Sequence, residues 1–284
     1  MNSTQILFLF VASSFFWSCF DLARKKLTEK LSVPLTLWIL MLGQIPLYAS
    51  FFISPDQRHV NSAYWFWGFL GLLVNFAANS LFIISVSISS FLKTVPMLSF
   101  TPVFSVIFSS SLLGERLSYW QMMGLAAVVL GAFMLNGWPS IKGDKKGPFL
   151  MQMAALAWGL MGVIDKKCLQ VSSMATHTVF QTSGLFIISS FWCLYLKEFK
   201  NLKNFKNYGA AAIGGVFSSV LAVVCQLYVL KFVLVPVLEA AKRGLGLFWT
   251  VLIARLVFSE DLDIRKLLSL GVMGLGLYWL LAGI

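Results

Sequence analysis

The stretch TQILFLFVASSFFWSCFDLA, residues 4–23, decides the fold class of this chain. Its length and its single charge match what an α-helix needs to cross the hydrocarbon core of a bilayer. No basic segment precedes the run, and Arg24-Lys25-Lys26 follows it at once. This order is not that of a cleaved secretion signal, so we expect a retained transmembrane helix whose basic end anchors it at the membrane surface.

Nine further apolar runs of similar length follow, with short connections between them. They cover residues 33–53, 65–85, 88–113, 119–138, 148–168, 174–196, 208–230, 234–257 and 264–283. The runs are continuously apolar, whereas the strands of a membrane β-barrel alternate apolar and polar residues. The sequence therefore predicts an all-α integral membrane protein with ten transmembrane helices.

The composition of the 284 residues agrees with this prediction. Apolar residues make up 58% and charged residues 12%, whereas soluble domains contain about 45–50% and about 25%. The abundance of Phe and Trp excludes disorder. The net charge of +11 comes mainly from cations between the apolar runs, so we interpret it as membrane anchoring and expect no nucleic-acid partner.

Two motifs recur across the middle of the chain. Trp17 and Trp158, 141 residues apart, each stand eight and nine residues before a pair of lysines, Lys25-Lys26 and Lys166-Lys167. A second match relates Leu113-Gly114-Glu115-Arg116-Leu117 to Phe258-Ser259-Glu260-Asp261-Leu262. We therefore expect the chain to consist of two repeats of five helices each.

The predicted repeats occupy residues 1–140 and 141–284. Because five is an odd number, the second copy enters the membrane upside down relative to the first. Inverted repeats are a recurring transporter architecture, with a site near the midplane between the halves that rocking exposes to each side in turn.

The chain resembles the drug/metabolite transporter superfamily and, within it, the EamA-like ten-helix transporters. The resemblance rests on the ten helices in two repeats and on Pro102-Val103-Phe104, Leu113 to Ser118, Lys242-Arg243, Leu247-Phe248-Trp249 and Phe258-Ser259-Glu260. It implies a cavity lined by the first, third, fourth, sixth, eighth and ninth helices. Small multidrug members use a glutamate deep in the first helix, and residues 4–20 here contain no acid, which argues against a multidrug-cation/proton antiporter.

Charged residues within the predicted helices are the first candidates for a substrate site, because a charge inside the bilayer is costly. Lys93 lies in the fourth run, and Lys242 and Arg243 lie in the ninth. Facing a cavity, they would bind a carboxylate, a phosphate or a zwitterion. Alternatively, Lys93 extends to the membrane surface, and Glu239 forms an ion pair within the helix with Lys242 or Arg243.

Amides and indoles form a second set of candidates. Asn75 and Asn79 share one face of the third run, where they either line the cavity or bond to neighbouring helices. Gln226 belongs to the same set, although its place near the end of the eighth run favours interhelical bonding. Trp17 and Trp158 lie at matching repeat positions and are either paired cavity walls or core packing.

Helix breakers mark two candidate hinges. Pro96 and Pro102 in the fourth run remove backbone hydrogen bonds and predict a kink, which serves as a hinge or only as shape. Gly244 and Gly246 follow the cations of the ninth run and permit close backbone approach, to another helix or to a ligand.

The remaining polar residues are less informative. Asp21 and Asp165 lie near the ends of the first and sixth runs, and Lys25 four residues after Asp21 indicates an exposed pair; proton coupling is the less favoured alternative. His59 and His177 have no acids or cysteines at metal-binding spacing. No catalytic group or phosphate-binding motif is present, so we expect no enzyme activity, cofactor or metal. The four cysteines lie in apolar runs and are interpreted as packing thiols.

The sequence thus predicts a secondary-active or facilitative transporter of a small anionic or zwitterionic, amino-acid-like metabolite. It would act by alternating access, as a monomer, as a multi-pass protein of the plasma (bacterial inner) membrane. A lipid or lipid-linked phosphate flippase and a non-transporting receptor or assembly factor are the alternatives. The distribution of Lys and Arg places the termini outside, whereas the resemblance places them in the cytoplasm. Substrate identity, transport direction and coupling ion are left open.

Overall fold

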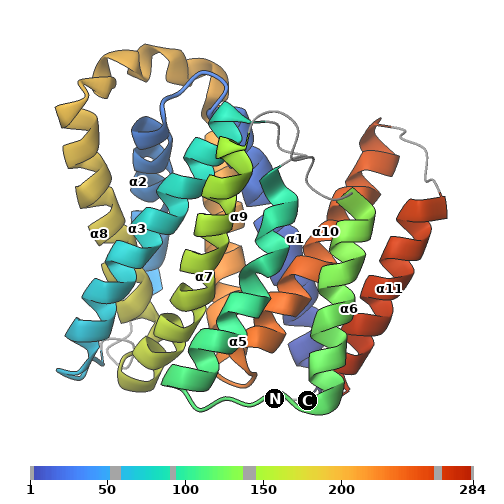
Figure 1. Ribbon diagram of the computed structural model, residues 1–284. Coiled ribbons are helices and arrows are strands. Elements are labelled where there is room, and N and C mark those ends of the chain that lie inside the picture. The colour runs from blue at the N-terminus through green and yellow to red at the C-terminus, as the bar shows by residue number, and fades with distance from the viewer. Residues whose placement is uncertain (1–2, 52–58, 90–93, 137–144, 259–263, 283–284) are drawn as a thin grey trace.

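A computed structural model describes residues 3–51, 59–89, 94–136, 145–258 and 264–282. Each of the ten predicted helices corresponds to a helical segment in these ranges (Figure 1). Those of the first half are α1 (Ser3–Leu27), α2 (Val33–Phe51), α3 (Tyr64–Ile88), η2 (Val95–Phe100) with α5 (Thr101–Leu112), and α6 (Tyr119–Asn136). Those of the second half are α7 (Lys146–Val171), α8 (Met174–Tyr195), α9 (Gly209–Leu230), α10 (Val235–Phe258) and α11 (Ile264–Leu281).

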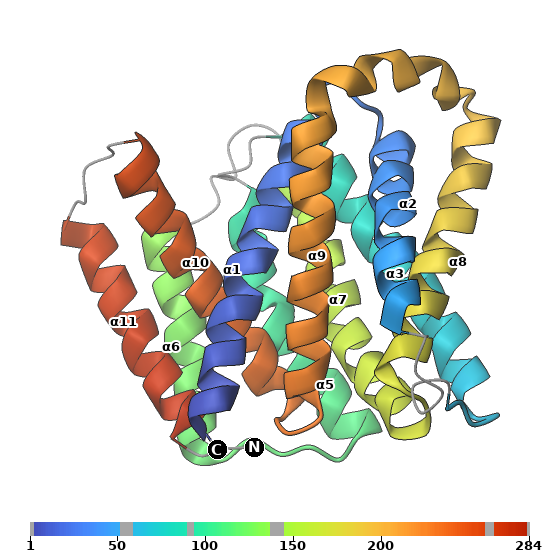
Figure 2. The same ribbon diagram turned by 180° about the vertical axis from the view of Figure 1, so that it is seen from behind.

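The helices have the properties of membrane spans. Within the described ranges, α1, α2, α3, α7, α8, α9 and α11 are each long and apolar enough to cross a bilayer. Large apolar side chains such as Phe8, Phe66 and Phe191 are exposed on outer surfaces, where lipid would contact them. The 3₁₀ helix η3 (Glu198–Tyr208) lies across one end of the bundle between α8 and α9 (Figure 2).

The fourth predicted helix differs from expectation. It is not one kinked helix over 88–113 but the 3₁₀ segment η2 followed directly by α5. Pro96 lies in the first turn of η2 and Pro102 in the first turn of α5. Proline lacks a backbone donor and is favoured in the first turn of a helix, where no donor is needed. Lys93, the cation predicted in this region, lies outside the described residues.

The two halves are inverted relative to each other. In Figure 1, α1 runs upward and its counterpart α7 runs downward, and the other counterpart pairs are reversed in the same way. The packing repeats with the halves exchanged, because α1 packs on α9 and α10 while α7 packs on α3 and α5. The boundary predicted at residue 140 lies outside the described residues.

The periphery is formed by counterparts that pack on each other. Figures 1 and 2 show α6 beside α11 at one edge of the bundle and α2 beside α8 at the other. Glycines bring α6 and α11 close, since a Cβ at Gly124 would lie 2.6 Å from the Gly276 carbonyl oxygen and one at Gly276 would lie 2.7 Å from that of Gly124. Small residues at such crossings allow backbones in a membrane to approach closely.

Candidate functional site

A polar cavity lies between the two halves. It is lined by α1, α2, α3, α7, α8, α9 and α10, and about 980 Å³ of space lies between its walls, the open solvent at its mouth included. The lining implied by the family resemblance is therefore wrong in part. The second and seventh helices, α2 and α8, contribute to the wall, while in the part of the chain that the structure describes η2 and α5 contribute no residue to it.

Most of the predicted substrate-site residues meet at this cavity, although they come from five different helices. Those that line it are Trp17, Asn75, Asn79, Trp158, Gln226, Glu239, Lys242 and Arg243. The predicted hinge glycines do not line it. A Cβ at Gly244 would contact Leu277 of α11 at 3.3 Å, and the Gly246 carbonyl accepts a hydrogen bond from Ser18, so both serve close approach between helices.

A compact polar cluster joins α1, α9 and α10 at the cavity. The Lys242 Nζ lies 2.7 Å from Glu239 Oε1, so the ion pair given as the alternative for this helix is present, with Lys242 as the partner. It also donates to Gln226 Oε1 at 3.0 Å, and the same oxygen accepts from Trp17 Nε1 at 2.9 Å. Lys242 and Glu239 are both buried. Each neutralises the charge of the other, and an isolated charge would be costly at this buried position.

Arg24 is a cavity residue that sequence reasoning interpreted as a surface anchor. The helix α1 continues to Leu27, so Arg24 remains inside the bundle with only 1% of its surface exposed. Its guanidinium forms an ion pair with Asp21. The guanidinium carbon also lies 3.8 Å and 4.5 Å from the ring centres of Phe82 and Phe20, which hold it by cation–π contacts.

The exposed pair expected between Asp21 and Lys25 is therefore wrong. Asp21 pairs instead with Arg24, three positions along the helix, and Lys25 donates to the Val86 carbonyl of α3 at 2.7 Å. Both i+3 and i+4 neighbours share a helix face, so spacing alone could not choose between them. Packing on α3 selected the partners.

Arg243 occupies an unusual position in the cavity. Within the described ranges it forms no ion pair or hydrogen bond, and its buried Nε has no acceptor. The Nε of Arg24 also lacks an acceptor, and the two guanidinium groups are close enough to interact electrostatically. Their carbons lie 5.4 Å and 5.9 Å from the ring centre of Trp158. Two buried donors without acceptors thus lie near the same indole.

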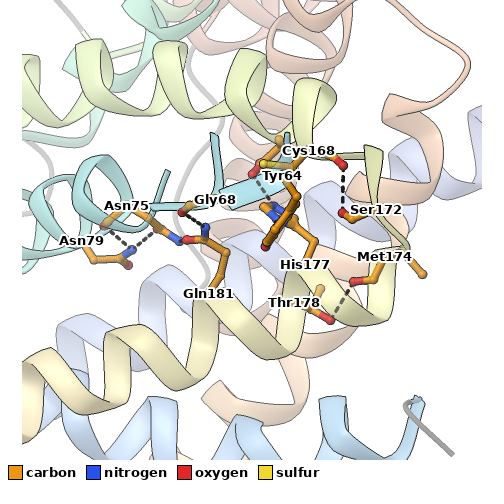
Figure 3. Close-up of polar contacts among 11 residues, drawn as sticks. Tyr64, Gly68, Asn75, Asn79, Cys168, Ser172, Met174, His177, Thr178 and Gln181 are labelled. Atoms are coloured by element: carbon orange, nitrogen blue, oxygen red, sulfur yellow. Dashed lines mark hydrogen bonds and ion pairs between the residues drawn. The ribbon is translucent and has the colours of Figure 1, made fainter. Parts of the chain in front are cut away.

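A chain of amides runs along the interface of α3 and α8 (Figure 3). Arg24 Nη1 donates to Asn79 Oδ1 at 3.1 Å, and Asn79 Nδ2 donates to Asn75 Oδ1 at 2.7 Å. Asn75 Nδ2 then donates to Gln181 Oε1 at 3.4 Å, and Gln181 Nε2 to the Gly68 carbonyl at 2.9 Å. Each side chain in this chain accepts a hydrogen bond from the previous one and donates to the next. The donors therefore all run in one direction, from the Arg24 guanidinium to the Gly68 carbonyl, and this fixes the orientation of the amides.

A buried histidine and carboxylate lie farther along the same interface. His177 Nε2 is 2.9 Å from Asp165 Oδ1, and His177 Nδ1 is 3.1 Å from the Tyr64 hydroxyl. Residue spacing gave no sign of this contact, which forms because α8 follows α7 after a short turn and brings the two side chains together. Figure 3 shows the contact between His177 and Tyr64, which belongs to α3.

The charges on the cavity wall do not all pair with one another. The acids are Asp21, Asp165 and Glu239, and the permanent cations are Arg24, Lys242 and Arg243. Asp21 with Arg24 and Glu239 with Lys242 form ion pairs. With a neutral His177, Arg243 and Asp165 remain as one cation and one anion without a charged partner among the described residues.

The acid that closes the fourth predicted helix is structural. Glu115 Oε1 lies 2.6 Å from Lys166 Nζ on α7, and Glu115 Oε2 accepts from the backbone N–H of Val235 at 2.9 Å. A carboxylate at the start of α10 is favoured by the helix dipole. This contact ties the end of α5 to α7 and α10, outside the cavity. Its repeat counterpart Glu260 lies outside the described residues.

Comparison with known proteins places this arrangement in a family. The model of the EamA-like transporter family matches residues 4–137 and again residues 145–282. The chain belongs to the EamA-like transporter family. This confirms the resemblance noted in the sequence, and it supports membrane transport as the general activity.

Individual relatives of this EamA-like chain are distant. A protein of Synechocystis sp., named an uncharacterized transporter, is 26% identical over 102 residues, which make up 35% of this chain and 31% of that relative. The chain also superposes on a solved structure described as "Crystal structure of protein". The TM-score is 0.70, the sequence identity is 14%, and the match covers 98% of this chain and 96% of the other chain. The latter shows a shared fold alone.

Proposed function

We propose that this EamA-like transporter carries a small anionic or zwitterionic, amino-acid-like solute by alternating access between its two halves. The observation that supports this is the pair of guanidinium groups of Arg24 and Arg243, whose buried Nε donors lack acceptors and which both lie near Trp158. A carboxylate there would accept charge-assisted hydrogen bonds from both groups.

The energetics favour a ligand at this position. A buried donor without an acceptor costs about 1–3 kcal/mol, so a solute that supplies oxygen acceptors recovers that free energy on binding. The carboxylate of Asp165, which contacts His177 and forms no ion pair with a lysine or arginine among the described residues, offers a second anchor for an ammonium group. A solute with both charges would find one partner for each.

The inverted packing supports the mechanism. The cavity walls come from both halves, and each half contributes one ion pair, Asp21 with Arg24 on α1 and Glu239 with Lys242 on α10. Rocking of one half against the other changes which end of such a cavity is open. We infer that the solute moves with its carboxylate near the arginines while the halves change position.

The test is flux into liposomes that contain the purified protein. The probes are radiolabelled L-alanine, L-methionine and L-phenylalanine, with a fluorescent phospholipid as the test for flipping. We expect uptake of at least one amino acid, and a reduction of about tenfold or more in Arg243→Gln, since a charge-assisted hydrogen bond contributes about 1.5–3 kcal/mol.

Arg116→Gln is the matched control, because Arg116 is exposed and lies outside the cavity. It should transport at the wild-type rate. Wild-type flux in Arg243→Gln would contradict the arginine site. Phospholipid flipping without amino-acid uptake would replace the proposal by the flippase alternative.

A further inference from the structure

We propose that Asp165 and His177 form a proton-binding site on the cavity wall, and that a proton bound there competes with the ammonium group of the transported solute. The competition rests on the proposed function, whereas the proton site stands on its own geometry. Its consequence is exchange of one proton for one zwitterionic solute.

The geometry suits a proton that enters and leaves. His177 is 2% exposed, yet both it and Asp165 line the cavity. In the neutral imidazole, Nε2–H donates to Asp165 and Nδ1 accepts from the Tyr64 hydroxyl. In the imidazolium, both nitrogens donate, and the Tyr64 oxygen accepts instead. Because a tyrosine hydroxyl serves either role, the same partners at 2.9 Å and 3.1 Å satisfy both states.

Among the described residues, Asp165 forms no ion pair with a lysine or arginine. Titratable and charged groups face the pair from α3, α7 and α10, and they are Tyr64, Cys168, Glu239 and Lys242. Lys242 is already paired with Glu239 at 2.7 Å. Among these groups, the imidazole of His177 is the one with a hydrogen-bond partner at each nitrogen, Asp165 Oδ1 at 2.9 Å and the Tyr64 hydroxyl at 3.1 Å, so the Asp165–His177 pair is the group that can hold an added proton.

Charge balance on the wall then explains the competition. With a neutral His177, Asp165 is an anion without a charged partner and attracts an ammonium group. With a protonated His177, the two form a closed ion pair, and Arg243 is left as the excess charge. The first state suits a zwitterion and the second suits an anion. When a zwitterion enters, the proton leaves His177 for the aqueous phase, and no covalent bond between heavy atoms changes.

The proton site can be tested without any solute. The chain contains two histidines, the exposed His59 and the buried His177, so a ¹³C-histidine sample in nanodiscs gives two titration curves by NMR. In Asp165→Asn we expect the His177 curve to lose its wild-type transition, while the His59 curve stays unchanged and serves as the internal control. Identical curves for both histidines in wild type and variant would overturn the proton site.

The competition is tested with matched probes in liposomes. L-alanine, L-methionine and L-phenylalanine are each compared with the analogue that lacks the amino group: propanoate, 4-(methylthio)butanoate and 3-phenylpropanoate. We expect the amino acids, and not their analogues, to move one proton in the opposite direction and to lose flux as pH falls. Asp165→Asn should remove this difference.

The outcomes separate the two proposals. Equal pH dependence for amino acids and analogues would overturn the competition and leave the transport function standing. Absence of flux for every probe, together with a His177 resonance that no probe shifts, would contradict both the transport function and the competition. The histidine titration would still decide whether the pair binds a proton.

Discussion

The two halves of the cavity wall share a scaffold and differ in chemistry. The repeat offset of 141 residues relates Arg24 to Asp165 and Thr36 to His177. At equivalent positions the first half thus carries a buried guanidinium and a buried hydroxyl, and the second half carries a carboxylate hydrogen-bonded to an imidazole.

This difference separates the requirements of motion from those of recognition. Inverted packing needs only that helix shapes match across the two halves, so the backbone symmetry is kept. Recognition of a solute with two unlike ends needs unlike groups, so the side chains at equivalent positions diverge. The two halves of the cavity wall therefore differ in charge, although their backbones are arranged alike.

The largest effect should come from breaking the ion pair of the second half. Lys242→Met leaves Glu239 buried and without a cation, which we expect to lower the free energy of unfolding by about 3–5 kcal/mol. The measurement is denaturant unfolding in detergent micelles. The double variant Lys242→Met with Glu239→Gln should recover most of the loss, and a double variant as unstable as the single one would contradict this account.

Breaking the ion pair of the first half should cost less. The Asp21 side chain keeps 15% of its surface exposed, against 2% for Glu239, so water partly solvates the carboxylate left by Arg24→Met. We expect a loss of about 1–3 kcal/mol in the same unfolding experiment. A loss equal to or larger than that of Lys242→Met would contradict this ranking of the two halves.

The contact between the peripheral counterparts provides a test of the shared scaffold. In Gly276→Ala the new methyl would lie 2.7 Å from a backbone oxygen of α6, and we expect a destabilisation of about 1–3 kcal/mol. The matched control is Gly274→Ala on the same helix, where a Cβ meets nothing within 4 Å. Thermal unfolding that ranks the two variants equally would show that close approach of α6 and α11 is not required.

The smallest effect should come from the amide chain beside the cavity. Asn75→Ala removes one acceptor and one donor between Asn79 and Gln181, and hydrogen bonds of this kind contribute about 1 kcal/mol each. We expect a modest loss of stability and a looser Arg24. Reduced affinity for amino acids in the flux assay, with little change in maximal rate, would report that loosening.

Several features followed from the sequence because they depend on properties of single segments. Run length and apolarity predicted the ten helices, since a bilayer demands both from every span. The repeated Trp and Lys spacing predicted the two halves, and charges within apolar runs identified Lys242, Arg243 and Glu239. Prolines predicted a kink in the fourth helix, whereas the structure has a 3₁₀ segment followed directly by an α-helix.

The partners of the charges were decided only by the tertiary structure. Arg24 and His177 are placed at the cavity by the continuation of α1 past its apolar run and by the turn that brings the start of α8 to Asp165 of α7. The repeat offset between Arg24 and Asp165 was a signal that could have drawn attention to both. A helix offers each side chain several neighbours at similar spacing, and packing against the other helices determines which of them it meets in a medium without water.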